Sequence, residues 1–410
     1  MIKRTIEGRI KNSVASRPVT LITGARQVGK TTLATAFREN GFGYVSIDNT
    51  NDMVTAQEDP ELFLQLHPCP LIIDEVQNAP GLFLALEHSV NSAKLENVRN
   101  YGMYILTGSQ SYSMMKGITE SMAGRVSIIE MSPLSRSEIL GRDEIPFSPN
   151  DLPALQKRAN ECPLSASDLF SNIVRGSFPE LYDNPKLSRS DFYESYVRTY
   201  MERDVSSLLK VGYVSAFRRF LEAIASLTGQ ELVYDTLAKA VEVDEKTIAS
   251  WVSILEAGHL ITLLRPYNET SVVKRVRKRP KMYFCDTGLA CHLARIDSPE
   301  TLSASYFAGR FVETYVVNEV IKSYKNGGIN AGFYYYRDKE QNEIDLLILH
   351  DGTLYPIDIK TGTRFDAKAV KSFKKLEGSK YRIGPGSVLC NADAVYPVSG
   401  NAYAIPISCL

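Results

Sequence analysis

Apolar and polar positions follow two different periods along the first 140 residues. Short apolar runs bounded by Gly, Pro, Asp or Ser alternate with stretches that repeat apolar residues at helical spacing, such as "KTTLATAFREN". Continuous apolar strands separated by helices are typical of a parallel sheet that is covered on both faces. We therefore expect an α/β fold with the strands "VTLITG", "YVSID", "PLIIDE", "MYILTG" and "VSIIEM".

The pattern changes twice beyond this region. Strand signals stop between about 152 and 209, where stretches such as "FYESYVRTYMERDVSSLLK" predict helices that form a lid or connector. Residues from about 214 to 266 predict three helices followed by a hairpin. The last 130 residues return to a mixed α/β pattern with the strands "FYYYRD", "EIDLLILH" and "YPIDIK".

The stretch "GARQVGKT", residues 24–31, fits the P-loop pattern G-x-x-x-x-G-K-[ST] between a predicted strand and a predicted helix. Backbone N–H groups and the helix N-terminus of such a loop cradle phosphates. Lys30 would reach the β- and γ-phosphates, and the Thr31 hydroxyl would bind Mg²⁺. The expected nucleotide contacts are Gly24, Ala25, Arg26, Gln27, Val28, Gly29, Lys30, Thr31 and Thr32.

Two carboxylates end the predicted strand "PLIIDE", which is the Walker B arrangement. Asp74 would hold the magnesium, and Glu75 would orient and deprotonate the attacking water. Phosphoryl transfer needs mainly positioning and charge neutralisation, so a metal carboxylate beside a base carboxylate suits it. The alternative is a strand that happens to end in acidic residues.

Two further positions are candidates for contact with the γ-phosphate. In "YILTGSQS" the strand ends in small polar residues, and a strand of this kind lies between the P-loop and Walker B strands; Thr107 and Ser109 are its candidates, with ordinary turn chemistry as the alternative. Arg125 in "SMAGRVSIIE" could sense or stabilise the γ-phosphate, within its own subunit or across an interface. A salt bridge at a helix–strand junction is the other interpretation of Arg125.

Composition limits the other possibilities. Hydrophobic residues make up 44% and charged residues 23%, as in ordinary globular proteins. Lys plus Arg (47) balance Asp plus Glu (47), so nucleic-acid binding would depend on local patches and no membrane binding is expected. The six cysteines show no metal-ligand spacing, which favours reduced thiols. With no signal-peptide pattern and no spanning apolar run, a cytoplasmic location is expected.

Residues 232–267 have the pattern of a helix–turn–helix: a helix ends near Val243, Asp244 can cap the next helix, and Gly258 ends that helix before a hairpin. The candidate wing "KRVRKRPK" carries six basic residues in eight positions and would suit contacts with the phosphates of double-stranded DNA. Acidic residues at the start of the second helix argue against base reading, and a protein-docking role stays open. The six basic residues are Lys274, Arg275, Arg277, Lys278, Arg279 and Lys281.

The C-terminal segment carries a second possible chemistry. Strand alternation places Glu343 and Asp345 on one face, and Asp358 and Lys360 likewise share a face. Together with Glu313 on the helix "GRFVETYVVNEVIKSY", this order resembles the PD-(D/E)xK nuclease signature. By that match, Asp345 and Asp358 would be Mg²⁺ ligands, Glu313 a supporting acid and Lys360 the catalytic cation. The alternative is an internal ion-pair network in a fold without nuclease activity.

Motifs in order along nearly the whole chain resemble one family, the bacterial and archaeal AAA-type ATPases that carry a C-terminal domain of formerly unknown function. Relatives commonly have Pro where this chain has Ala25, which is not a ligand position. The resemblance implies an ATPase core, a winged-helix-like middle and a restriction-endonuclease-like end. The motifs are "GARQVGKTT", "LIIDEVQ", "ILTGSQS", "AGRVSIIEMSPLS", "GSFPE", "YVRTYMERDV" and "KRPKMYFCDTGLA".

We therefore expect an AAA-type P-loop core over 1–150, a helical lid over 151–212, a winged-helix-like module over 213–283 and a PD-(D/E)xK-like α/β domain over 284–410. The expected cofactors are ATP and Mg²⁺. Two functions remain open. The chain is an ATPase that acts on DNA and gates its C-terminal domain, or it is a nucleotide-controlled interaction protein whose C-terminal domain binds a partner. A homo-oligomer is possible in either case.

Overall fold

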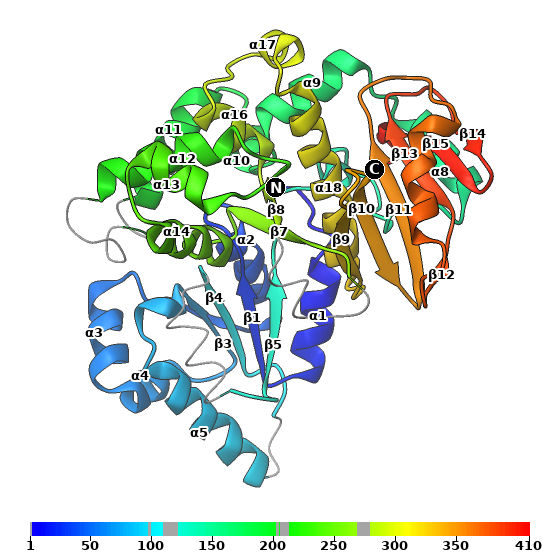
Figure 1. Ribbon diagram of the computed structural model, residues 1–410. Helices are drawn as coiled ribbons and strands as arrows, with labels where there is room; N and C mark the ends of the chain where they lie inside the picture. The colour runs from blue at the N-terminus through cyan, green and yellow to red at the C-terminus, as the bar shows by residue number, and fades with distance from the viewer. Residues whose placement is uncertain (1, 97–99, 110–121, 202–204, 206–212, 269–278) are drawn as a thin grey trace. The chain divides into compact units, whose positions relative to one another are not determined.

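The computed structural model describes residues 2–96, 100–109, 122–201, 205, 213–268 and 279–410. These residues form two compact units, shown in Figure 1. The first comprises Met1–Leu134 with Ala257–His259 and Asn326–Gly328, and the second comprises the rest. Among the described residues, none of the helices combines the length and the apolar character that crossing a bilayer requires.

The first unit is built on a five-stranded, all-parallel sheet with the order β2-β3-β4-β1-β5. All five strands predicted from the apolar runs are present, and β4 lies between the P-loop strand β1 and the Walker B strand β3, as expected. The strands are β1 (Val19–Thr23), β2 (Gly43–Ser46), β3 (Leu71–Asp74), β4 (Tyr104–Gly108) and β5 (Val126–Glu130). The helices are α1 (Glu7–Ser16), α2 (Lys30–Thr35), α3 (Thr50–Glu58), α4 (Pro60–Leu66) and α5 (Leu82–Leu95), with short 3₁₀ turns η1 (Ala36–Asn40) and η2 (Val76–Asn78).

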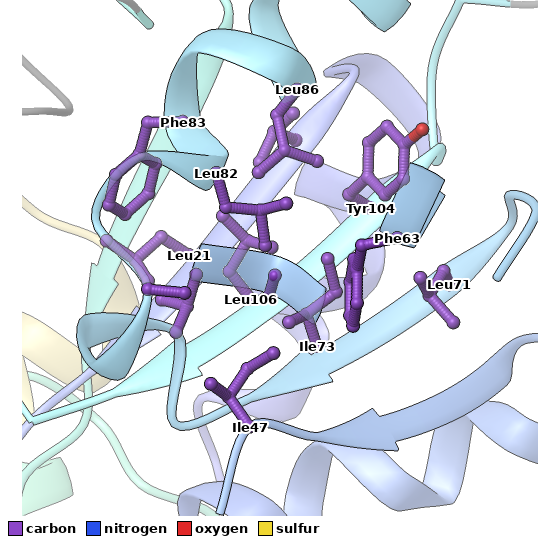
Figure 2. Close-up of a cluster of buried hydrophobic side chains, with 14 of the residues drawn as sticks. Leu21, Ile47, Phe63, Leu71, Ile73, Leu82, Phe83, Leu86, Tyr104 and Leu106 are labelled. Carbon is purple, nitrogen blue, oxygen red and sulfur yellow. The ribbon is translucent and has the colours of Figure 1, made fainter. Parts of the chain in front are cut away.

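Helices cover both faces of this sheet. One face packs against α3, α4 and α5 through a buried cluster that includes Leu21, Phe63 and Leu106, drawn in Figure 2. The other face of β1 meets α1, where the Ser13 and Thr20 hydroxyls are 2.7 Å apart. Alternate residues of β1 therefore point to opposite covered faces, which explains why every residue of the strand is buried.

The second unit starts with the expected helices: α7 (Arg136–Ile139), α8 (Leu152–Glu161), α9 (Ala166–Arg175), α10 (Glu180–Asp183), α11 (Arg189–Tyr200) and α12 (Val214–Ala225). The helix–turn–helix follows as α13 (Tyr234–Val241) and α14 (Glu245–Ala257). Asp244 caps α14 as predicted, since its carboxylate accepts from the Thr247 N–H at 2.9 Å. The hairpin is β7 (Ile261–Pro266) with β8 (Lys281–Phe284), and β8 also pairs with β6 (Gln230–Glu231).

The C-terminal part continues this hairpin. Strand β7 pairs in parallel with β9, so the hairpin and the C-terminal strands form one sheet of order β14-β15-β13-β11-β10-β9-β7-β8-β6, with β12 beside β11. The boundary expected at 283/284 falls inside this sheet. Its remaining strands are β9 (Gly332–Arg337), β10 (Glu343–His350), β11 (Thr353–Ile359), β12 (Arg382–Ile383), β13 (Gly386–Cys390), β14 (Tyr396–Ser399) and β15 (Ala402–Pro406). Its helical elements are α16 (Thr287–Leu293), α17 (Pro299–Ala304), α18 (Ala308–Gly327), η4 (Ala367–Leu376) and η5 (Ile407–Cys409).

Candidate functional site

The P-loop connects β1 to α2 in the conformation that its glycines permit. Gly24 and Gly29 have φ values of 147° and 95°, a region that favours glycine. A Cβ at Gly24 would lie 2.2 Å from the backbone oxygen of Met131, so the close approach of the two backbones requires glycine there. The buried Lys30 ammonium donates to the carbonyl oxygens of Gly24 (3.0 Å) and Ala25 (2.7 Å). These bonds hold the Lys30 ammonium at the loop where the phosphates of a nucleotide are expected to bind.

The other loop residues divide by burial. Ala25 and Val28 are buried, so they offer the loop interior only their backbone groups. Gln27 is exposed and adopts a left-handed φ of 59°, and Arg26 is partly buried. Thr32 is exposed on the first turn of α2. In a P-loop the phosphates are bound by backbone N–H groups and the start of the following helix, so the burial of the Ala25 and Val28 side chains is compatible with the predicted anion site.

Asp74 is the centre of the site, at the carboxyl end of β3. The Thr31 hydroxyl lies 3.0 Å from both Asp74 carboxylate oxygens, so the two predicted magnesium ligands are in direct contact. Thr107 on β4 donates to Asp74 Oδ1, and Tyr44 on β2 donates to Oδ2 at 3.0 Å. Burial, with Asp74 beside it, raises the pKa of Tyr44 to about 12, so this hydroxyl stays a donor at neutral pH. Carboxylate and hydroxyl oxygens are ligands that Mg²⁺ prefers, and this donor set fits the ion.

Glu75 follows Asp74 in a left-handed conformation with φ 56°. Non-glycine residues are uncommon in this region, and at functional sites such strain aims a side chain. The Gln77 side-chain amide donates to Glu75 Oε2 and steadies the carboxylate. Ser109 leaves β4 at the same edge of the sheet, because Gly108 pairs with Thr23 at the start of the P-loop.

One candidate of the sequence analysis is corrected by the strand pairing. Val126 pairs in parallel with Val19, so Arg125 precedes the amino end of β5, whereas the P-loop follows the carboxyl end of β1. Five residues of strand separate these edges by about 16 Å. Arg125 instead pairs with Glu87 (3.2 Å) and with Asn91 (3.0 Å) on α5. A γ-phosphate role within its own subunit is therefore wrong, and the salt-bridge interpretation applies within the chain.

Arg4 supports the P-loop and was missed from the sequence. Its buried guanidinium donates to the carbonyl oxygens of Val28 (2.7 Å) and Ser132 (2.6 Å), which fastens the loop to the segment after β5. Charge-assisted hydrogen bonds of this kind are among the stronger ones. No local motif marks Arg4, because both of its partners are distant in sequence.

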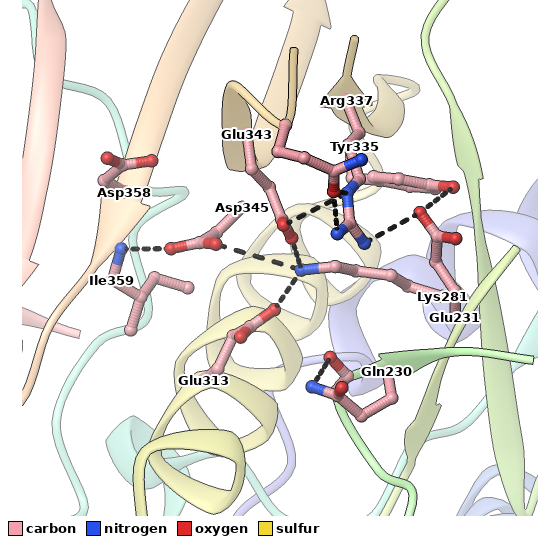
Figure 3. Close-up of polar contacts among 12 residues, drawn as sticks. Gln230, Glu231, Lys281, Glu313, Tyr335, Arg337, Glu343, Asp345, Asp358 and Ile359 are labelled. Atoms are coloured by element: carbon pink, nitrogen blue, oxygen red, sulfur yellow. Dashed lines mark hydrogen bonds and ion pairs between the residues drawn. The ribbon is translucent and has the colours of Figure 1, made fainter. Parts of the chain in front are cut away.

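A second cluster of charged residues lies in the second unit, where β8, β10 and α18 meet (Figure 3). Lys281 on β8 is 3% exposed, and its ammonium lies 2.9 Å from Glu313 Oε1 and 3.8 Å from Asp345 Oδ1. It also pairs with Glu343. Burial alone would lower the pKa of Lys281, but Tyr283 and the acids Glu313, Asp345 and Glu343 raise it well above its usual value. Lys281 is therefore a charged internal cation.

This position corrects one DNA candidate. Lys281 was expected to contribute to the basic patch of the wing, but it is buried among acids and does not face solvent. Arg279 is exposed. Lys274, Arg275, Arg277 and Lys278 lie outside the described residues.

The residues matched to the nuclease signature lie beside Lys281. Lys360, directly after β11, is 3.5 Å from Asp345 Oδ2 and 3.8 Å from Asp358 Oδ2. Asp345 Oδ2 also accepts from the Ile359 N–H at 2.8 Å. Burial, with Asp345 nearby, raises the pKa of Asp358 to about 7, and its Oδ1 has no hydrogen-bond partner. Glu319, also on α18, instead forms an ion pair with Lys322, whose Nζ lies 2.9 Å from Glu319 Oε1.

These acids do not fit a divalent metal as they stand. Among the residues that the structure describes, no group of three or more His, Cys, Asp or Glu side chains is arranged to hold a metal ion. The Lys281 ammonium already lies between Glu313, Glu343 and Asp345, where it supplies positive charge. The C-terminal cluster is thus an ion-pair network in this conformation.

Three sequence families match separate parts of this chain. Residues 16–140 match the AAA domain, residues 166–300 match a domain of unknown function (DUF8612), and residues 308–410 match another (DUF4143). With the P-loop, the Walker B strand and the parallel sheet in place, the first unit is an AAA-type P-loop ATPase domain.

Curated relatives and solved structures extend over more of the chain. Uncharacterized protein Rv2008c of Mycobacterium tuberculosis and uncharacterized protein Mb2031c of Mycobacterium bovis are each 26% identical over 373 residues, which is 90% of this chain and 76% of theirs. The Walker-type ATPase PABY2304 of Pyrococcus abyssi is similar over 72% of this chain and 96% of its own, with 15% identity and a TM-score of 0.44.

Proposed function

We propose that this chain binds ATP with Mg²⁺ at residues 24–31 and Asp74, and hydrolyses it. The observation that carries the proposal is the contact of the Thr31 hydroxyl with both Asp74 oxygens at 3.0 Å, at the edge of the sheet where the P-loop begins. A bound magnesium ion would neutralise charge on the phosphates. Residues of the chain would contribute to the reaction by positioning the phosphates and the attacking water.

Each residue has a defined part in this proposal. The backbone of the loop and the Lys30 ammonium bind phosphate oxygens, and Thr31 and Asp74 hold the metal. Glu75, set apart from Asp74 by its left-handed backbone, accepts a proton from the attacking water. Thr107 and Tyr44 fix the Asp74 carboxylate through hydrogen bonds, so they are positioning residues.

ATP binding and turnover in matched variants test the proposal. Lys30→Ala should lose most nucleotide affinity, whereas Glu75→Gln should bind ATP normally and turn over about a hundredfold more slowly. Glu61→Gln, an exposed acid in the same unit, is the control and should behave as wild type. Wild-type turnover by Glu75→Gln would remove it from the role of base. Stimulation of the wild-type rate by double-stranded DNA would add DNA to the partners of the ATPase.

We further propose that the second unit is an interaction module rather than a nuclease. In this proposal, ATP binding to the first unit acts as a conformational switch that controls binding of a partner. The supporting observation is the Lys281 ammonium among Glu313, Glu343 and Asp345. The competing proposal is Mg²⁺-dependent cleavage by Asp345, Asp358 and Lys360, with Glu313 in support.

Plasmid and linear DNA incubated with Mg²⁺ or Mn²⁺ separate the two proposals. Wild type and an Asp358→Ala, Lys360→Ala double variant should leave DNA equally intact. Cleavage by wild type that the double variant loses would establish the nuclease and remove the interaction proposal.

A further inference from the structure

A row of lysine side chains lies along the exposed side of η4 in the second unit. Lys368, Lys371 and Lys374 recur at every third residue of this 3₁₀ helix, and all three are exposed. Because a 3₁₀ helix has three residues per turn, side chains at i and i+3 eclipse, so these lysines leave the helix along one line. With a rise of about 2.0 Å per residue, they follow one another at about 6 Å and span about 12 Å. We call these three residues the lysine row.

A second side of η4 holds the helix on the C-terminal strands. Val370, Phe373 and Leu376 follow the same period of three residues and form an apolar line. Leu376 belongs to the buried cluster that contains Leu347, Val370 belongs to the one that contains Val388, and Phe373 packs against both. This packing fixes the helix, so the lysine row is a rigid feature of the surface.

Positive charge accumulates in the segment that contains the lysine row. Residues 360–382 include eight basic and two acidic residues, a net charge of +6 in a chain whose net charge is zero. One of the acids, Asp366, caps η4 by accepting from the Lys368 N–H at 2.9 Å. The other, Glu377, follows the helix and is exposed. The segment is therefore strongly basic, although the chain as a whole is neutral.

Two acids from a neighbouring turn pair with a different lysine of η4. Asp338 and Glu340, which follow β9, lie 3.6 Å and 2.8 Å from the Lys375 ammonium. Lys375 is one residue beyond Lys374 and therefore leaves the helix on another side. Within the described ranges of the chain, none of the three ammonium groups of the lysine row forms an ion pair. Like charges about 6 Å apart repel one another, and a bound polyanion would relieve that repulsion.

The chemistry of this surface favours phosphates over the other anionic partners. Protein interfaces are enriched in aromatic residues, Met and Arg and are depleted of Lys. Single-stranded nucleic acids are bound largely by aromatic side chains on which their bases stack. Every aromatic and large aliphatic side chain of residues 360–382 is buried or half-buried, so neither kind of contact is offered. An amphipathic helix binds a membrane through its apolar face, and that face of η4 is packed on the sheet.

We propose that the lysine row binds the phosphate backbone of double-stranded DNA. This inference rests on the proposed interaction role of the second unit and supplies its partner. A duplex is a stiff rod with regularly spaced negative charges, and a rigid row of ammonium groups is complementary to it. Each lysine contacts phosphate as a point charge, so binding does not depend on base sequence. The lysine row is distinct from the basic run at 274–281, and the second unit thus has a DNA contact outside its helix–turn–helix.

Fluorescence anisotropy of a labelled DNA duplex of about 20 base pairs, titrated with the full-length chain at several salt concentrations, tests the proposal. EDTA is present, so no metal-dependent cleavage can obscure binding. The variant Lys368→Gln/Lys371→Gln/Lys374→Gln should bind at least tenfold more weakly at about 50 mM salt. It should also reduce the slope of log affinity against log salt concentration by about 2.7, because each phosphate contact contributes about 0.9. Replacing the same three lysines by arginine should preserve both the affinity and the slope.

The matched control removes the same charge from exposed lysines elsewhere in the chain. Lys94→Gln/Lys157→Gln/Lys186→Gln should bind the duplex as wild type does. The proposal is overturned if wild type does not bind the duplex, or if the lysine-row variant matches wild type in affinity and salt slope. Tighter binding of single-stranded DNA, of polyglutamate or of phosphatidylserine vesicles than of the duplex also overturns it.

Failure of the proposed function would look different from failure of this inference. Cleavage of the bound duplex once Mg²⁺ replaces EDTA would remove the interaction proposal, yet a weakened lysine-row variant would still place DNA on η4. Absence of duplex binding, in contrast, would remove DNA as the partner and leave both ATP hydrolysis and the interaction role as proposed.

Discussion

Substituting Lys281 by methionine keeps a long, unbranched side chain and removes the ammonium group. In the wild type that group lies 2.9 Å from Glu313 and 3.8 Å from Asp345, pairs with Glu343, and is almost wholly buried. The variant therefore removes the cation that lies beside Glu313, whereas Asp345 keeps its contact with Lys360 and Glu343 keeps its contact with Arg337. Removing one partner of a buried ion pair costs about 3–5 kcal/mol, because the remaining charge stays buried and uncompensated.

A divalent cation should recover part of this loss in the variant alone. Ca²⁺ takes oxygen ligands in flexible geometry, and Glu313, Glu343 and Asp345 would offer it carboxylates. At a concentration about a hundred times its dissociation constant, a ligand that binds only the folded state stabilises it by about 2.7 kcal/mol. The wild type should gain little, since Lys281 already supplies positive charge there.

Urea unfolding followed by tryptophan fluorescence measures both effects. Trp251 on α14 is the chain's single tryptophan and is buried in the second unit, so its signal reports that unit. Wild type, Lys281→Met and Lys281→Met/Glu313→Gln are compared with calcium chloride or with sodium chloride of equal ionic strength. The double variant should lose most of the calcium gain. If Lys281→Met unfolds within about 1 kcal/mol of wild type without calcium, the idea of an internal cation is refuted.

Three further predictions concern other sites. Arg4→Gln should weaken ATP affinity about tenfold by releasing the P-loop carbonyl, whereas Arg17→Gln, at an exposed arginine of the same unit, should not. Equal affinities of Arg4→Gln and wild type would show that the P-loop keeps its conformation without Arg4. If Arg125 acts across a subunit interface, Arg125→Ala should lower turnover without lowering ATP affinity, and wild-type turnover per chain should rise with protein concentration; a rate independent of concentration would oppose this. Burial raises the pKa of Glu313 to about 7 from its usual 4.5, so its contribution to stability is present below about pH 4.5 and is lost as pH rises through 7, by roughly 3 kcal/mol. Glu313→Gln should flatten this pH dependence in urea titrations, and an unchanged slope would assign it to other groups.

Local patterns in the sequence were enough to predict the AAA-type fold of the first unit with its P-loop and Walker B strand. The P-loop and the Walker B strand each lie within a few consecutive residues, so their chemistry shows in their spacing. The five strands also followed from period and composition, because the central strands β1, β3 and β4 are buried at every position and are largely apolar. The contact of Thr31 with Asp74 then required only that β1 and β3 belong to one parallel sheet.

Features that depend on distant residues could not be predicted in this way. Arg4 reaches the P-loop from before α1, and Tyr44 reaches Asp74 because β2 pairs with β3. Arg125 was a candidate for contact with the γ-phosphate, but the direction of β5 places it at the opposite edge of the sheet. Lys281 stood in a basic run that is typical of a solvated surface, and its burial depends on α18 and β10, which follow it in sequence.

The carboxylates of Asp74 and Glu313 have different hydrogen-bond partners, and this difference decides which of the two can accept a metal ion. Asp74 is held by hydroxyl groups, which carry no charge and, in the case of Thr31, can become metal ligands themselves. Glu313, by contrast, is held by the Lys281 ammonium. A divalent cation about 4 Å from that ammonium would face a repulsion of about 8 kcal/mol at an effective dielectric constant near 20. Metal binding in the second unit therefore requires Lys281 to move away or be removed, whereas in the first unit it requires only that hydroxyl hydrogens turn.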